Sequence, residues 1–302
     1  MPSSASTSRR AGTRPAGSAS SGSTRSERYV VKLGGSLDAD ITGPCDDIRE
    51  LAAAGAEVVV VHGGGAAADR VGAELGRPPR YLTGRGGRRS RYTDAAALDV
   101  LRLGILGRVK PDLVAALVNL GVRAVGLSGV DGGLVTATRN KPARATVDGV
   151  EVVVRDDLSG RIASVDPAVL ETLLGGGFTP VVSPPALGTG GETLNVDADR
   201  FAAALAVALA ADWLVVLSDV PGLLADRHDP ASLVTRVPTG SLDAHLAAAD
   251  GRMKVKVRAA AEARAGGVRN VVLADGRVHS PVLTACAGAG TRFVEERHVE
   301  AS

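Results

Sequence analysis

The chain has 302 residues, of which 45% are hydrophobic and 23% charged, and its formal net charge is +2. This length and balance predict one large domain or two closely joined lobes, with a core that needs no disulfide cross-links. Cys45 and Cys286 lie far apart and match no metal-binding spacing, so we expect a reducing, cytoplasmic location. The most apolar run, 201–211, is much shorter than the roughly 20 residues of a membrane span, so we expect no membrane contact.

The charge is distributed unevenly along the chain. Residues 1–28 hold five arginines and one glutamate, a net of +4, so the remaining residues carry −2. Residues 1–27 are rich in Ser, Gly, Ala and Arg and poor in large apolar side chains, which predicts a disordered tail. Binding of nucleic acid by this tail is one hypothesis. A globular part of net −2 argues against general binding of polyanions, and we expect no nucleic-acid partner.

After the tail, short β-branched segments alternate with segments rich in Ala and Leu. Strands are expected at Tyr29–Leu33, Glu57–Val61, Ala124–Leu127, Glu151–Val154, Pro180–Ser183, Trp213–Leu217 and Asn270–Leu273. Helices are expected at Asp46–Ala54, Ala66–Leu75, Thr93–Leu120 (bent near Pro111), Pro167–Leu174, Asp197–Ala211 and Met253–Ala265. The alternation predicts an α/β fold with a mainly parallel sheet covered on both faces. Val135 and Glu151–Val154, on either side of the Asp148-Gly149 turn, predict an inserted hairpin.

Glycine-rich turns follow two of the expected strands. Lys32 lies at the tip of the first strand, before Gly34 and Gly35, and the second strand ends in His-Gly-Gly-Gly at 62–65. Glycines let backbone N–H groups approach an anion closely, and a lysine supplies the opposite charge. Either turn alone is equally well an ordinary strand-to-helix turn with a solvated lysine. Together, at the carboxyl ends of parallel strands, they indicate two walls of one anion-binding pocket.

Two further segments begin helices. Arg91 precedes an expected helix start, with Thr93 as the expected N-cap, and its planar guanidinium can hold a carboxylate at two points. Asp197 is expected to cap the helix that it begins, and Asp199 lies in the first turn of that helix. Acidic residues in a first turn often only complement the helix dipole. For Asp199 we favour a role in orienting lysines around a transferring phosphoryl group.

The last third of the chain adds a polar turn and a basic helix start. The turn 218–222, Ser-Asp-Val-Pro-Gly, follows a buried strand and suits the base, ribose or phosphate edge of a nucleotide. Lys254 and Lys256 lie at the start of the last long helix, where a cation is disfavoured unless an anion is nearby. Lysines from two halves of the chain, glycine N–H groups and one carboxylate meet the needs of phosphoryl transfer.

Taken in order, these segments resemble the amino acid kinase family over about residues 28–295. The resemblance implies an open αβα sandwich with a mainly parallel, eight-stranded sheet of the carbamate kinase type. It implies an acyl-substrate lobe at 28–190 and an ATP lobe at 191–302. The implied catalytic residues are Lys32, Lys256 and Asp199. The implied contacts are Gly64, Gly65, Arg91 and Asn195 for the substrate and Gly34, Gly35, Ser218, Asp219 and Gly222 for the nucleotide. Magnesium is implied with ATP, without direct protein ligands, and we expect a homodimer.

Within that family, the segments 75–83 and 86–94 are similar to the branch that acts on carrier-bound 2-aminoadipate. In that branch the amino group of the substrate is attached to a small acidic carrier protein of the LysW type. A physical argument agrees, because a basic rim on a core of net −2 is suited to steering an acidic protein partner. The residues of this predicted carrier surface are Arg85, Arg88, Arg89, Arg139, Lys141 and Arg144. A solvated, arginine-rich loop is the competing interpretation.

The sequence therefore predicts an ATP-dependent kinase that converts a side-chain carboxylate into an acyl phosphate, in lysine biosynthesis through aminoadipate. The alternatives are N-acetylglutamate 5-kinase of arginine biosynthesis and a kinase of a related carrier-dependent pathway. A nucleotide-sensing module without turnover is a hypothesis of another class. The presence of Lys32, Asp199 and Lys256 together argues against it, because binding alone does not need all three.

Overall fold

The computed structural model of the chain describes residues 25–34, 40–84, 87, 89–229, 231–249 and 251–295. Most of the tail predicted to be disordered, residues 1–24, lies outside the described residues. So do Gly35, predicted for the nucleotide, and Arg85 and Arg88, predicted for the carrier. Over the described residues, no helix has both the length and the apolar character that crossing a membrane requires.

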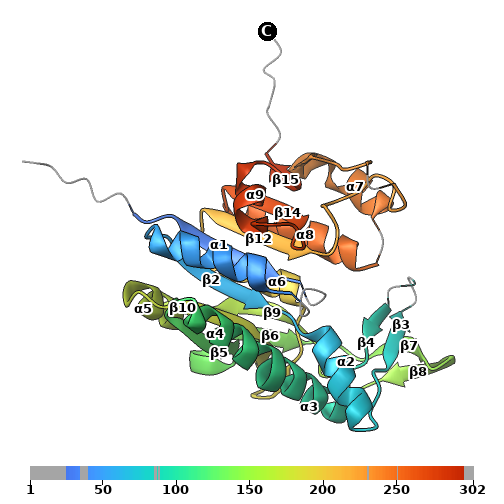
Figure 1. Cartoon of the computed structure of the whole chain (residues 1–302). Helices are drawn as coiled ribbons and strands as arrows, with labels where there is room; N and C mark the ends of the chain where they lie inside the picture. Colours follow the sequence, from blue (N-terminus) through green and yellow to red (C-terminus); the bar gives the residue numbers. More distant parts are fainter. Residues whose placement is uncertain are drawn as a thin grey trace, which may run out of the picture.

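Eleven strands of the described residues form one large sheet (Figure 1). Its order is β13-β15-β14-β12-β1-β2-β10-β6-β9, and β5 and β11 also pair with β10. The strands are β1 (Arg28–Leu33), β2 (Glu57–His62), β5 (Ala124–Gly129), β6 (Val135–Arg139), β9 (Gly160–Val165), β10 (Thr179–Gly188), β11 (Thr193–Leu194), β12 (Trp213–Ser218), β13 (Arg236–Pro238), β14 (Asn270–Asp275) and β15 (Thr291–Val294). The central run β14-β12-β1-β2-β10-β5 is parallel throughout. The predicted fold class is confirmed, with more strands than the eight expected because short segments extend the sheet at its edges.

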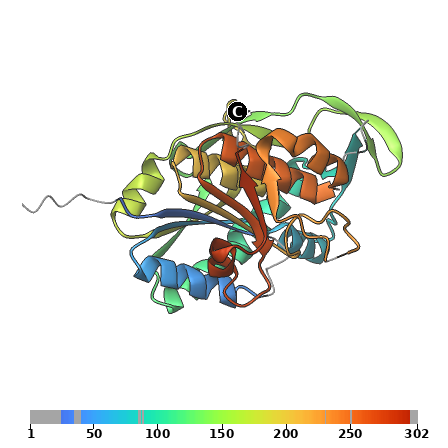
Figure 2. The ribbon, with the colours of Figure 1, turned by 90° about the horizontal axis from the view of Figure 1, so that it is seen from above.

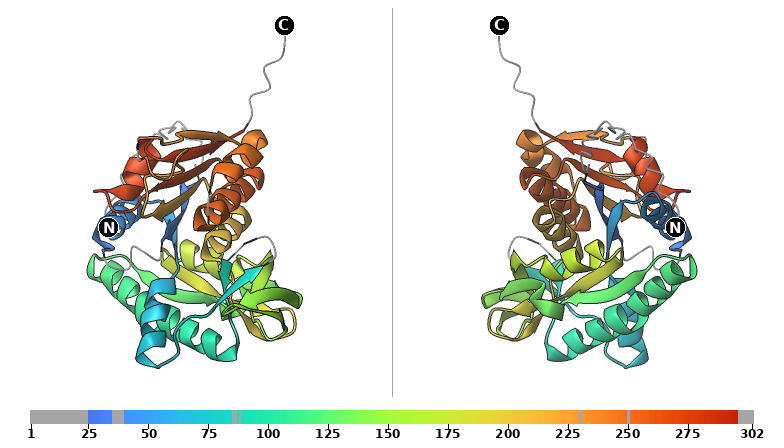
Figure 3. Two further views of the ribbon diagram at one scale, coloured as in Figure 1. Left: turned by 90° about the vertical axis from the view of Figure 1, so that its right-hand side faces the viewer. Right: turned by 90° about the vertical axis from the view of Figure 1, so that its left-hand side faces the viewer.

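Helices cover both faces of this sheet, as Figure 3 shows. One face carries α1 (Thr42–Ala53), α4 (Lys110–Asn119) and α9 (Pro281–Ala287), and the other carries α5 (Ala168–Gly175), α6 (Ala198–Ala208) and α8 (Gly251–Ala265). The remaining helices are α2 (Gly65–Glu74), α3 (Ala95–Gly104) and α7 (Leu242–Ala248). We refer to the two sides of the sheet as the α1/α4 face and the α6/α8 face.

The central strands are apolar on both sides because both sides are covered. Val30 and Val59 pack toward the α6/α8 face, and their neighbours Val31 and Val60 pack toward the α1/α4 face. All four valines are fully buried. This explains why these strands show a continuous apolar sequence rather than an alternating one.

The long helix expected at 93–120 is interrupted. It consists of α3, a π-helical turn at Ile105–Val109 and α4, and Pro111 lies at the start of α4. Proline has no N–H to donate, so the regular hydrogen-bond ladder cannot continue through it. The structure accommodates this by a wider turn just before Pro111, and such turns are frequent at functional sites.

A second sheet of four strands has the order β4-β3-β7-β8. Its strands are β3 (Tyr81–Gly84), β4 (Arg89–Arg91), β7 (Ala143–Val147) and β8 (Val150–Val154). The prediction of the hairpin is wrong for one of its two strands. The Asp148-Gly149 turn joins β7 to β8, both turn residues having positive φ, whereas Val135 lies in β6 of the large sheet. Figure 2 shows this hairpin projecting at the end of the molecule opposite to α5.

Candidate active site

Lys32 lies near the carboxyl end of β1, in the middle of the parallel sheet. Strands β2 and β12 flank it on both sides, and its side chain is 4% exposed. Its neighbours Val31 and Leu33 point to the α1/α4 face, so the alternation of the strand directs Lys32 to the α6/α8 face. There its Nζ lies 2.6 Å from Oδ1 of Asp199.

Asp199 is held in place by the start of α6. The carboxylate of Asp197 accepts hydrogen bonds from the backbone N–H groups of Asp199 and Arg200, which confirms Asp197 as the N-cap. The pKa of the Asp197 carboxyl is raised, first by the protein packed around it and then by the charge of Asp199. The cap fixes the backbone of the first turn, and the Asp199 side chain points into the space between α6, β1 and α8.

Lys256, in α8, completes a group that we call the lysine pair, Lys32 and Lys256 on either side of Asp199. Nζ of Lys256 lies 3.0 Å from Oδ2 of Asp199. Burial, followed by the charge of Lys32, lowers the pKa of Lys256 to about 8. Burial alone would raise the pKa of Asp199, but the two lysines outweigh it and hold that pKa at about 2. Two ammonium groups therefore share one ionised carboxylate in a buried place, which favours the arrival of a further anion.

Two turns next to the lysine pair have no room for a side chain. At Gly34, a Cβ atom would lie 2.9 Å from the carbonyl oxygen of Leu217 at the end of β12. Gly64 has φ of 152°, and a Cβ there would lie 3.0 Å from Cγ1 of Ile105 in the π-helical turn. Glycine is required at both places. Both turns thus bring the backbone into close packing at the carboxyl edge of the sheet.

Arg91 and Asn195 lie on the side of the site formed by the small sheet. Nη2 of Arg91 donates to Oδ1 of Asp69 at 2.5 Å and lies 3.4 Å from the carbonyl oxygen of Gly65. The Nδ2 of Asn195 donates to the hydroxyl of Thr93 at 3.3 Å. The structure therefore brings three of the predicted substrate contacts, Gly65, Arg91 and Asn195, to one region.

The helix cap near Arg91 differs from the prediction. Asp94, and not Thr93, caps α3, since its carboxylate accepts a hydrogen bond from the N–H of Ala97. Thr93 instead donates its N–H to Asp157, a carboxylate that the sequence interpretation did not single out. Burial raises the pKa of the Asp157 carboxyl. Asp157 ties the segment after β8 to the start of α3 and so supports Arg91.

The residues predicted for the nucleotide lie around the end of β12. Ser218 is buried and its carbonyl oxygen accepts from the N–H of Gly276, whereas Asp219 is exposed. Gly222 has φ of 155°, and a Cβ there would lie 2.5 Å from the hydroxyl oxygen of Thr291. That hydroxyl accepts from the N–H of Leu223 and donates to the carbonyl of Val234, which fixes the turn.

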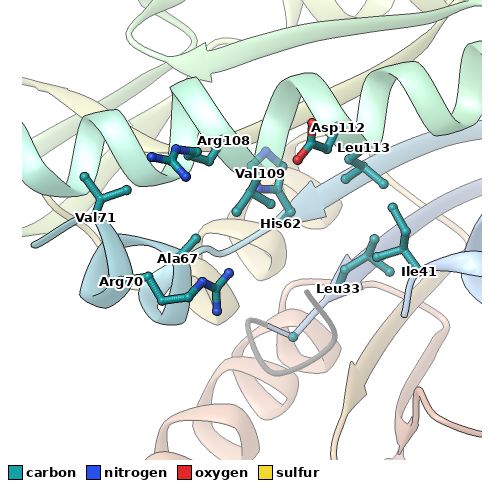
Figure 4. Close-up of a pocket in the computed structure, with 11 residues that line it drawn as sticks. Leu33, Ile41, His62, Ala67, Arg70, Val71, Arg108, Val109, Asp112 and Leu113 are labelled. Carbon is teal, nitrogen blue, oxygen red and sulfur yellow. The ribbon is translucent and has the colours of Figure 1, made fainter. Parts of the chain in front are cut away.

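A pocket of about 180 Å³ opens on the α1/α4 face of the same strand ends (Figure 4). Its wall includes Leu33 and Gly34 from the first strand turn and His62 from the second, together with Val109 and Asp112. The pocket and the lysine pair lie on opposite sides of these strand ends, because the ammonium groups point to the α6/α8 face. Nothing in the sequence distinguishes His62 within its turn. The pocket is lined in part by the π-helical turn, which the sequence did not predict.

The predicted carrier residues have different environments. Arg139 donates to the carbonyl oxygens of Asp157 and Arg155, so its guanidinium holds its own chain together. Arg89 is exposed and stacks over the ring of Tyr81 at 4.0 Å, and Lys141 and Arg144 are exposed as well. Of the described residues of the carrier surface, Arg89, Lys141 and Arg144 are thus exposed, whereas Arg139 bonds to its own backbone.

The described residues include no group of three or more His, Cys, Asp or Glu side chains that suits a metal ion. Asp199 is the one carboxylate between the lysines, and each of its oxygens already lies within 3.1 Å of a lysine Nζ. This donor set fits an arrangement in which the phosphates of a nucleotide, rather than protein side chains, hold a magnesium ion.

Comparison with known proteins gives a consistent result. The model of the amino acid kinase family matches residues 27–275. The [LysW]-aminoadipate kinase of Deinococcus radiodurans is 43% identical over 87% of this chain and 90% of its own length. The acetylglutamate kinase of Symbiobacterium thermophilum is 36% identical over 88% of this chain and 91% of its own. Among solved structures, the carbamate kinase of Giardia has a similar fold, with a TM-score of 0.63, 18% identity and coverage of 90% of this chain and 100% of its own.

Proposed function

Since this chain belongs to the amino acid kinase family, we propose that it transfers the γ-phosphoryl group of ATP to a side-chain carboxylate. The acceptor that we propose is 2-aminoadipate whose amino group is attached to a small acidic carrier protein. The observation that carries the reaction type is the lysine pair, two buried ammonium groups from distant parts of the chain on one carboxylate. The acceptor is supported by the 43% identical relative that is named a [LysW]-aminoadipate kinase.

The reaction joins an acceptor carboxylate oxygen to the γ-phosphorus while the bond from that phosphorus to the β,γ-bridging oxygen breaks. Both the attacking carboxylate and the transferring group are anionic, so positioning and neutralisation of charge are the main tasks of the protein. We assign neutralisation to Lys32 and Lys256. Asp199 holds the two ammonium groups on either side of the path, so their mutual repulsion does not drive them apart.

The glycine turns supply the remaining donors in this proposal. The N–H groups of Gly34 and Gly64 would bind phosphoryl oxygens, since glycine lets the backbone approach an anion closely. Ser218, Asp219 and Gly222 lie where a nucleotide bound at the end of β12 would contact the protein. Magnesium, bound by the phosphates, would neutralise part of their charge.

Arg91 is suited to the free carboxylate of the acceptor. One of its terminal nitrogens is held by Asp69, which fixes the plane of the guanidinium and leaves its other N–H groups for a ligand. Asn195 lies on the same side of the site through its bond to Thr93. Together they would fix the end of the acceptor that does not react.

The carrier is proposed to bind over Arg89, Lys141 and Arg144. Each is exposed and basic, and they lie on the small sheet that also carries Arg91 or on its connection to β6. An acidic partner would be attracted to this side of the site, with its effect mainly on association rate. A homodimer, a cytoplasmic location and the division into lobes at residue 190 stay predictions.

Direct assay with two acceptors tests this function. Purified protein with ATP and magnesium should phosphorylate carrier-linked aminoadipate, detected as an acyl hydroxamate, much faster than free N-acetylglutamate. Turnover of free N-acetylglutamate with none of the carrier adduct would assign the chain to the second candidate, which the 36% identical acetylglutamate kinase supports. Binding of ATP without transfer to either acceptor would favour a sensing module.

A further inference from the structure

His62 is a buried polar residue to which the proposed reaction assigns no task. It ends β2, is 2% exposed and lies on the wall of the pocket beside Val109 (Figure 4). Its Nδ1 lies 2.7 Å from the carbonyl oxygen of Gly63, while its Nε2 has no hydrogen-bond partner among the described residues. A buried polar atom without a partner costs free energy, so a hydrophobic residue here would be the less costly choice unless the imidazole has a task.

The contact with Gly63 fixes the tautomer of the ring. A carbonyl oxygen can only accept, so Nδ1 carries the proton and donates it, and Nε2 bears the lone pair. The surroundings keep the ring neutral, because burial and the charges of Lys110 and Lys32 lower the pKa of His62 to about 3. Asp112, Arg70 and Arg108 are the other charged groups of this pocket. The donor therefore stays on Nδ1 across the physiological pH range.

Fixing the Gly63 carbonyl also fixes the next N–H group. The carbonyl of Gly63 and the N–H of Gly64 belong to one planar trans peptide, so they point in opposite directions. The imidazole lies on the α1/α4 side of the strand ends, where the pocket opens. Holding the carbonyl there turns the Gly64 N–H to the other side, on which Lys32 and Asp199 lie.

The π-helical turn packs against the same Gly63–Gly64 peptide. Gly64 packs against Ile105 and Val109 of that turn, closely enough that a Cβ would be 3.0 to 3.3 Å from them. Directly after the turn, Lys110 is 8% exposed and donates from its Nζ to the carbonyl oxygen of Leu127 in β5. The glycine turn is thus held from two directions, by the imidazole and by a helix that is itself tied to the sheet.

We propose that His62 is a positioning residue for phosphoryl transfer, which holds the Gly63 carbonyl so that the Gly64 N–H faces the transferring group. The inference rests on the proposed kinase reaction, but it does not depend on which acceptor is used. An N–H group preset toward developing charge needs no reorganisation during the reaction, and a mispositioned one loses most of that advantage. His62 would therefore act on the rate of transfer more than on binding.

Three substitutions of His62 separate this task from packing. In His62→Asn, the side-chain amide can place an N–H near the position of Nδ1, whereas in His62→Gln it reaches only the position of Nε2. His62→Leu fills the space without a donor. With the acceptor that the wild-type protein uses best, we expect kcat to fall roughly 30- to 100-fold for Gln and Leu, with KM for ATP within about twofold. We expect Asn to restore kcat to within about fivefold of wild type. Equal losses in Asn and Gln at equal thermal stability, or full activity in Leu, would overturn the proposal.

Nuclear magnetic resonance of the imidazole nitrogens tests the premise without any turnover. In the full-length wild-type protein we expect Nδ1 to be protonated, Nε2 to be unprotonated, and neither signal to change between pH 8 and 5. A proton on Nε2, or titration near the ordinary histidine pKa of about 6.5, would overturn the proposal. Because this readout requires no acceptor, failure of the proposed acceptor in the kinase assay leaves it interpretable.

Discussion

Strand β1 carries a buried cation near each end. The two cations differ in the number of carboxylates that bond to them. Arg28, at its first residue, bonds to Glu57 at 2.7 Å, to Glu171 at 2.7 Å and to the carbonyl oxygen of Leu209. Lys32, four residues later, shares the single carboxylate of Asp199 with Lys256. Arg28 thus bonds to two carboxylates at the amino end of the strand. At the carboxyl end, Lys32 and Lys256 bond to one shared carboxylate, and the capping carboxylate of Asp197 interacts with both lysines from further away.

This difference distinguishes a structural cluster from a site that can bind a ligand. At the amino end every strong donor of Arg28 finds an acceptor, and the surplus negative charge belongs to glutamates that reach solvent. At the carboxyl end two buried lysines bond to one shared carboxylate, so they keep N–H groups for an anion in a place where water does not replace it. At the amino end of β1 the charged groups thus stabilise the packing of several elements, and at the carboxyl end they favour binding of an anion.

The largest expected effect comes from removing one member of the lysine pair. Lys32→Met should lower kcat about a thousandfold or more, because the transferring group loses one of its two charge partners. Thermal stability should stay close to that of wild type, since the remaining Lys256 still pairs with Asp199. Steady-state kinetics and a melting curve check this prediction. A strong loss of stability with little loss of kcat would make Lys32 a structural residue like Arg28.

The pH dependence gives the next effect. Lys256 has a pKa of about 8 in the fold against an ordinary value of 10.5, so kcat/KM should fall about tenfold per unit as pH rises above 8. Between pH 8 and 10.5, Lys256 binds more protons in the unfolded chain than in the folded protein. The contribution of Lys256 to the free energy of unfolding should therefore rise with pH in that range. Activity and this contribution to stability therefore change in opposite directions.

A pH–rate profile with parallel denaturant titrations measures both trends. Lys256→Arg is the matched control, because a guanidinium keeps its charge and should remove the alkaline loss of whatever activity remains. Parallel loss of activity and stability above pH 8 would instead indicate alkaline unfolding.

Arg28→Met tests the other end of the strand. It leaves Glu57 and Glu171 without their shared partner and should lower the free energy of unfolding by about 2–4 kcal/mol. The lower part of the range applies if both glutamates turn to solvent. The folded fraction should retain kcat within about twofold, because the substitution is remote from the glycine turns. Denaturant unfolding and kinetics at low temperature check it, and a kcat loss as large as that of Lys32→Met would remove the distinction between the two ends.

Arg91→Lys tests the acceptor side with a smaller effect. A lysine cannot bond Asp69 and a substrate carboxylate in the same plane, so KM for the acceptor should rise roughly 10- to 100-fold with kcat less affected. KM for ATP should stay unchanged and serves as the internal control. An effect confined to kcat would place Arg91 at the reacting end of the acceptor.

The smallest effect is expected for the carrier surface. Replacing Arg89 or Arg144 by Ala should lower kcat/KM for the carrier-linked acceptor about two- to fivefold each and weaken its dependence on salt. Arg139→Ala is the contrasting variant, since it breaks bonds to the backbone at Asp157 and should reduce stability instead. Stopped-flow association at several salt concentrations measures the difference. Unchanged salt dependence in both surface variants would contradict a carrier at this place.

The sequence predicted the parts of the site that depend on strand ends and helix starts. Lys32 lies near the end of β1, Asp199 in the first turn of α6 and Lys256 in the second turn of α8, and parallel strands bring such positions to one edge. The prediction that Asp197 caps its helix is confirmed. Thr93 and Asp94 are adjacent and both residue types can cap a helix, so the sequence did not decide between them.

What the sequence could not predict depends on contacts between distant residues. Strand β10 runs to Gly188, past two prolines that ended the expected strand at Ser183, because its second half pairs with β6 and β11. The arm of the hairpin was misplaced because both β6 and β7 have strand-like sequences before the same turn. The tasks of His62 and Asp157 arise from single hydrogen bonds that no periodicity reveals.

The central claim is that Lys32 and Lys256 act on one transferring phosphoryl group. A crystal structure with ADP, magnesium, aluminium fluoride and the acceptor tests it most directly, because the fluoride complex occupies the place of that group. We predict that both Nζ atoms lie within hydrogen-bond distance of its fluorine atoms while each keeps its contact with Asp199. A complex in which only one lysine, or neither, reaches the fluoride would contradict the account.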